Sequence, residues 1–75
     1  KNESMIGKEI LDMIEGKVAD ESAYIGRTYG DAPKVDGYIF VQTGELLMSG
    51  DFAKVRVTGA LEYDLIGVLS DEYTE

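Results

Sequence analysis

The sequence predicts a small all-β barrel, and three observations support this fold class. Nine glycines and one proline divide the 75 residues into apolar segments of about four to eight residues, which is the length of strands. With 44% apolar residues the chain can build a core, but it has room for one domain only. Short strands in one small domain favour a barrel, because closing the sheet leaves no exposed edge.

Residues 8–15, the first segment, are open to two interpretations. Their apolar side chains recur at i, i+1, i+3 and i+4, and leucine, methionine, glutamate and lysine favour helices. This periodicity slightly favours a helix that ends at Gly16. The four segments that follow favour an all-β fold nonetheless.

These four later segments are predicted to be strands. Residues 23–29 are interrupted by Gly26, as at a bulge or at a close approach of another chain segment. Residues 38–41 form an aromatic and β-branched run. Apolar and polar side chains alternate with a period of two in residues 52–58, which makes this the clearest strand, and residues 64–69 form the last one.

Three parts are expected along the chain. We interpret residues 1–5 as a linker from a preceding domain, residues 6–69 as the barrel domain and residues 70–75 as an acidic tail. The start at Lys1, instead of at methionine, is typical of a fragment of a longer protein.

Composition excludes several kinds of chemistry for these residues. The chain has no cysteine and no histidine, so we expect no disulfide, no metal site, no iron–sulfur ligation and no catalytic residue within it. A net charge of −8 repels nucleic acid at long range and favours a basic partner. No apolar run approaches the ~18 residues of a membrane span, so no membrane partner is expected.

Acids on two predicted loops are the first candidates for binding. Asp31 and Asp36 lie on the long turn before the third strand, and Glu62 and Asp64 lie before the last one. Together they would form a negative surface that steers a cationic protein. The alternative for each single acid is a local role, in which its side chain caps a turn.

Cations and rings give a rival hypothesis. Lys54 and Arg56 share one face of their predicted strand with Phe52, and Arg27 is the best single candidate for a binding cation. The rings that would join them are Tyr24, Tyr29, Tyr38 and Phe40. Such a surface is typical of OB-type binding of single-stranded RNA. Alternatively, some of the rings are core and the cations pair with acids.

Three apolar residues, Leu46, Leu47 and Met48, lie between Gly44 and Gly50, where a loop is predicted. Apolar residues on a loop either plug one end of a barrel or contact another surface. Both interpretations are open from the sequence.

Two strings in the sequence resemble a known family. GRTYGDAPKVDG occupies residues 26–37, and GDF at residues 50–52 is followed by VRVTGA and then by EYDLIG, which ends at Gly67. Their order and spacing resemble the C-terminal TRAM domain of RimO-type methylthiotransferases. The resemblance covers residues 6–67, and the EYDL string is typical of the branch that modifies ribosomal proteins.

This resemblance implies a fold and a function. The fold would be a five-stranded OB-like barrel in which the first segment is a strand. Such enzymes add a methylthio group to an aspartate of a small-subunit ribosomal protein in the cytoplasm, using S-adenosylmethionine and two iron–sulfur clusters. The clusters would be held by upstream domains of the same polypeptide, which include a radical SAM domain, so this chain alone would not be an enzyme.

By the same resemblance, the barrel would bind the basic ribosomal protein. The residues expected to contact it are Arg27, Tyr29, Asp31, Asp36, Glu62 and Asp64. Relatives that modify transfer RNA are thought to use the module to hold RNA, which is one alternative here. A purely structural domain that covers the catalytic body is another.

Overall fold

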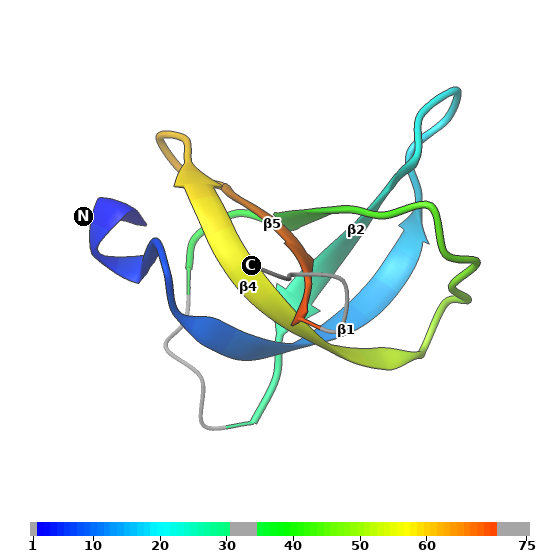
Figure 1. Ribbon diagram of the computed structural model, residues 1–75, viewed down its shortest axis with the longest axis horizontal. Helices are drawn as coiled ribbons and strands as arrows, with labels where there is room; N and C mark the ends of the chain where they lie inside the picture. The colour runs from blue at the N-terminus through cyan, green and yellow to red at the C-terminus, as the bar shows by residue number, and fades with distance from the viewer. Residues whose placement is uncertain (1, 31–34, 71–75) are drawn as a thin grey trace.

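A computed structural model describes residues 2–30 and 35–70 and contains five strands (Figure 1). A short 3-10 turn, η1 (Asn2–Met5), precedes them. The strands are β1 (Glu9–Lys17), β2 (Ala23–Thr28), β3 (Ile39–Gln42), β4 (Phe52–Ala60) and β5 (Leu65–Leu69). They close into one barrel in the order β1-β2-β3-β5-β4, with β3 and β5 parallel and all other neighbours antiparallel. The predicted all-β five-stranded barrel is confirmed.

The first segment is a strand, so the helical interpretation of its periodicity is wrong. From Glu9 to Ile14, exposed and buried side chains alternate, with Ile10 and Ile14 facing the interior. This strand pairs with β2 on one side and with β4 on the other. Burial and two ladders of hydrogen bonds outweigh a helix preference that is worth only tenths of a kcal/mol per residue.

The core consists mainly of β-branched and leucine side chains from β1, β3, β4 and β5. Met5 of η1 and the ring of Tyr24 pack against this interior. The fully buried apolar side chains of the strands are Ile14, Ile39, Val41, Val55, Val57 and Leu65. One layer of inward residues fills a barrel of this size, as the period-two pattern of β4 predicts.

Gly26 is a site of close approach, as its position in the sequence predicted. A Cβ atom at this position would lie 2.5 Å from Oδ1 of Asp12 and 2.6 Å from the carbonyl oxygen of Met13. Real side chains do not approach so closely, and therefore β2 comes near β1 only with glycine here. The bulge lies in β1 instead, between Ile14 and Gly16.

The three apolar residues of the loop between β3 and β4 divide between the interior and the surface. Leu47 is partly buried and packs against the core. Leu46 and Met48 point outward, with 87% and 68% of their surfaces exposed. The Tyr24 hydroxyl lies beneath the loop, where it accepts a hydrogen bond from the Leu47 N–H and donates one to the Glu45 carbonyl. Of these three residues, it is therefore Leu47 that fills the end of the barrel.

Candidate functional site

Two loops that are distant in the sequence lie side by side at one end of the barrel. The Gly37 N–H donates to the Tyr63 carbonyl over 2.9 Å, which joins the segment before β3 to the turn between β4 and β5. This contact brings three of the predicted acids to the same end: Asp36, Glu62 and Asp64. We call these three residues the acidic edge.

The three acids of this edge differ in their local contacts. Asp36 and Glu62 are exposed. Asp64 is half-buried, and its Oδ1 accepts a hydrogen bond of 2.8 Å from the Tyr38 N–H. Asp64 therefore stabilises the start of β3, as in the local role considered for each acid, and the side chains of Asp36 and Glu62 lie at the surface.

Arg27 lies beside the acidic edge, where it contacts Glu15 and Tyr38. Its Nε is 3.0 Å from Oε2 of Glu15, and its guanidinium lies 5.0 Å from the centroid of the Tyr38 ring. The hydrogen bond to the Tyr38 hydroxyl and the charge of Glu15 both raise the pKa of Arg27. Arg27 and Asp36 line the same shallow pocket of about 120 Å³. The structure thus brings together Arg27, Asp36, Glu62 and Asp64, four of the predicted site residues.

Tyr29 lies on the outer face of β1, β2 and β4, the same face as Arg27, but it makes different contacts. Its ring contacts that of Phe52, with the centroids 4.7 Å apart and the planes tilted by 59°. Leu11 and Met13 belong to β1, the strand between β2 and β4. The Tyr29 N–H donates to the Leu11 carbonyl, and Met13 is paired with Phe52. We call Leu11, Met13, Tyr29 and Phe52 the ring platform.

Charges of both signs surround the ring platform. The cations on this face are Arg27, Lys54 and Arg56, and the acids are Glu9 and Glu15. Glu9 is directly opposite Arg56 in the register, and Glu15 pairs with Arg27. This surface is therefore a mixed one, not a continuous positive groove. Tyr24, considered as a further ring for it, is buried in the core.

One buried carboxyl was not among the candidates. Asp12 faces the interior between Ile10 and Ile14 and is 0% exposed. Neither of its oxygens accepts a hydrogen bond of normal geometry within residues 2–30 and 35–70. Burial raises the pKa of Asp12 to about 7, and the charge of Glu15 adds to this, whereas the Met13 N–H acts in the opposite direction. The neutral carboxylic acid is thus the favoured form below neutral pH.

Some expectations fall outside what the structure describes. Asp31 lies in the gap between residues 30 and 35, and residues 71–75 of the predicted tail follow the last described residue. Within the described part of the chain, no three side chains of the metal-ligating types cluster closely enough to hold an ion. The same residues contain no helix that is long and apolar enough to cross a membrane.

Comparisons with known proteins give similar sequences over most of the chain. The family model described as the TRAM domain matches residues 6–69. A ribosomal protein uS12 methylthiotransferase RimO from Lachnoclostridium phytofermentans is 60% identical over 65 residues, which cover 87% of this chain and 15% of that protein. Proteins of the same name from Natranaerobius thermophilus and Aquifex aeolicus are 43% and 45% identical over 99% and 89% of the chain. The chain spans 15–17% of the length of these three relatives.

Proposed function

Because the chain belongs to the TRAM domain family, we propose that it is the substrate-binding module of a ribosomal protein uS12 methylthiotransferase. Its partner in this function is the basic small-subunit ribosomal protein uS12, and it acts in the cytoplasm. The module itself performs no chemistry. Without cysteine it does not fit an iron–sulfur cluster, so the two clusters, S-adenosylmethionine and the methylthio transfer belong to other domains of the polypeptide, which include a radical SAM domain.

The observation that carries this proposal is the acidic edge. Two loops, separated by more than twenty residues of sequence, are joined by a hydrogen bond so that Asp36 and Glu62 lie at one end of the barrel. The nearby cation, Arg27, is already paired with Glu15. Since the whole chain carries a charge of −8, this end attracts a cationic protein and repels a polyanion.

Binding of this kind contributes to catalysis because it holds the substrate protein close to the reacting centre. A barrel that holds the ribosomal protein raises the local concentration of the target aspartate near the reacting centre. Arg27 and Tyr38 contact one another beside the acidic edge. The charge of the acidic edge then speeds the encounter, and the contact between Arg27 and Tyr38 helps to orient the bound protein.

RNA binding is the second candidate, and the ring platform is the observation that favours it. Tyr29 and Phe52 are both about half exposed, and Lys54 lies on the same face. Bases stack on such rings with little dependence on sequence. The net charge of the chain and the two acids on this face oppose the binding of phosphates, so we rank RNA below the ribosomal protein.

Charge reversal at the acidic edge is expected to weaken binding of uS12. The double variant Asp36→Lys/Glu62→Lys loses two attractions and gains two repulsions, each worth at most about 1 kcal/mol at contact in water and less once distance and salt reduce it, so the Kd should rise by about tenfold or more. Calorimetric titration of purified uS12 at low ionic strength measures this change. Asp64 is left in place because it also holds the start of β3.

A matched control separates this local effect from net charge. The double variant Glu21→Lys/Glu45→Lys makes the same change of charge at two other exposed sites, on different loops. It should raise the Kd of uS12 clearly less than the acidic-edge variant does. Equal weakening by the two variants would contradict a local site and leave only a general effect of charge.

A further inference from the structure

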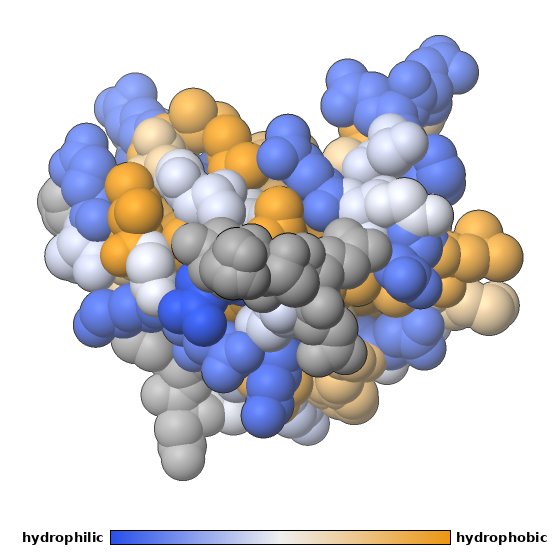
Figure 2. Space-filling model, viewed as in Figure 1, coloured by the Kyte–Doolittle hydropathy of each residue, from blue (hydrophilic) through white to orange (hydrophobic). Residues whose placement is uncertain are grey.

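The end of the barrel opposite the acidic edge exposes apolar side chains on a loop. Leu46 and Met48 are more exposed than any other large apolar residue within residues 2–30 and 35–70. Figure 2 shows hydrophobic colour at the right-hand margin of the molecule, where Figure 1 has the loop between β3 and β4. With Leu47, Ala53 and Leu69, these two residues form what we call the apolar end.

Hydrogen bonds fix the conformation of this loop. The Tyr24 hydroxyl accepts from the Leu47 N–H over 3.0 Å, and Oδ2 of Asp51 accepts from the Met48 N–H over 2.9 Å. The Ser49 hydroxyl donates to a backbone carbonyl of β1 over 2.8 Å. Contacts on both sides of the exposed leucine and methionine hold them outward, so a partner that binds them does not have to order the loop.

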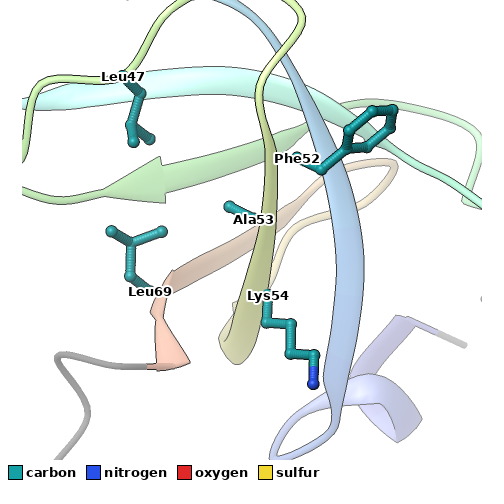
Figure 3. Close-up of a pocket in the computed structure, with 5 residues that line it drawn as sticks. All are labelled: Leu47, Phe52, Ala53, Lys54 and Leu69. Atoms are coloured by element: carbon teal, nitrogen blue, oxygen red, sulfur yellow. The ribbon is translucent and has the colours of Figure 1, made fainter.

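A groove continues from the loop onto the sheet. Its volume is about 290 Å³, and Leu47 and Leu69 point toward one another across it, with Ala53 between them and Lys54 at its rim (Figure 3). Pairing between β4 and β5 begins at Val55, opposite Leu69, so the first residues of β4 have no residue of β5 beside them. Among the residues that the structure describes, the groove is therefore open, apolar and bordered by one positive charge.

We propose that the apolar end docks onto the larger remainder of the polypeptide, on an apolar surface that places a carboxylate opposite Lys54. Similar proteins are about six times longer than this chain, so in them a barrel of this kind is joined to a much larger body. Permanent interfaces are more apolar than transient ones, which suits the exposed leucine and methionine. Lys54, the one charged residue among the described residues that line the groove, selects an acidic group on that body.

A second copy of the chain is a poorer occupant of this site. Two copies that each carry −8 repel one another, and an isologous contact would bring two Lys54 ammonium groups together as well. The body of the same polypeptide is also present at a high effective concentration, which a free copy is not. Attachment through one end fixes the direction in which the other end of the barrel points.

Docking at this end is compatible with the proposed binding of uS12 but does not depend on it. The groove is lined by Phe52, the first residue of β4. The acidic edge lies beyond Ala60, the last residue of the same strand. A barrel attached through the apolar end keeps the acidic edge free. The two proposals can therefore fail separately.

Hydrogen–deuterium exchange tests the docking. In the full-length polypeptide that contains this chain, the amides of residues 46–48 and 52–54 should exchange at least tenfold more slowly than in the 75-residue chain. The amides of Asp20 and Glu21, on the hairpin between β1 and β2, should exchange equally in both. Equal exchange of residues 46–54 in the two proteins would overturn the proposal.

Variants distinguish docking from a change in the stability of the fold. Leu46→Ser/Met48→Ser in the full-length polypeptide should abolish the additional protection, and in the 75-residue chain it should leave the thermal midpoint unchanged. Leu61→Ser, at a leucine with 50% exposure on the opposite end of β4, is the matched control and should keep the protection. Protection that rises with the concentration of the 75-residue chain would show a second copy instead, and protection lost when the chain is cut after Ser70 would show its own last residues. Either result overturns docking on the larger body.

Discussion

Replacing Gly67 with alanine is expected to leave the chain largely unfolded at room temperature. A Cβ atom at this buried position of β5 would lie 2.5 Å from Cγ1 of Val55 and 2.7 Å from the carbonyl oxygen of Arg56. Because a backbone atom of β4 is one of these neighbours, the two strands must separate and the barrel must open. We expect a loss of roughly 3 kcal/mol or more, against a total stability that rarely exceeds about 5 kcal/mol in domains of this size.

Circular dichroism in increasing urea measures this loss, and Gly59→Ala is the matched control. At Gly59 the nearest atoms to an added Cβ belong to Ile66, at 3.8 and 3.9 Å, which is ordinary contact. This variant should stay within about 1 kcal/mol of the parent chain. A Gly67→Ala chain as stable as Gly59→Ala would show that the barrel does not close between β4 and β5 as described.

Replacing Asp12 with asparagine is expected to stabilise the barrel at neutral and basic pH and to flatten its dependence on pH. The folded state holds the proton of Asp12 up to a pKa of about 7, and the unfolded state releases it near 3.8. Between these values the folded state binds more protons, so the free energy of unfolding falls as pH rises. The loss is complete above the folded pKa and amounts to roughly 2–4 kcal/mol in total.

Urea titrations of both proteins from about pH 4 to about pH 8 test this prediction. Asparagine has nearly the shape of the neutral acid, so the variant should keep its stability where the parent chain loses it. The remaining slope of the variant reports the mutual repulsion of the other acids, which acts in the same direction. Parallel curves for the two proteins would contradict a buried, unpaired carboxyl at Asp12.

The strands were predictable where burial of side chains determines them. In β4, the alternation of Ala53, Val55 and Val57 with polar residues matches the face that packs inward. In β1, leucine, methionine and glutamate suggested a helix. The segment forms a strand because pairing in the barrel requires only that alternate residues face inward. The same helical interpretation hid the buried Asp12, which lies on the inward face only when the segment is a strand.

The candidate site was predictable in its charges but not in its contacts. Acids on loops that flank strands indicated a negative surface, and Asp36 and Glu62 do lie at the same end of the barrel. Arg27 and Tyr29 are two residues apart and lie on the same side of an extended chain, but strand register gives them different partners: Tyr29 meets Phe52 across β1, whereas Arg27 pairs with Glu15. No local pattern specifies that register.

Titration of the isotopically labelled chain, followed by nuclear magnetic resonance, tests most directly whether this barrel binds a cationic protein. With purified uS12 at low ionic strength, we predict that amide signals of Asp36, Glu62 and Asp64 shift, and that added salt reverses the shifts. Single-stranded RNA at the same concentrations should leave the spectrum unchanged. Shifts at Tyr29, Phe52 and Lys54 with RNA, together with none anywhere with uS12, would contradict the account and make the ring platform the binding surface.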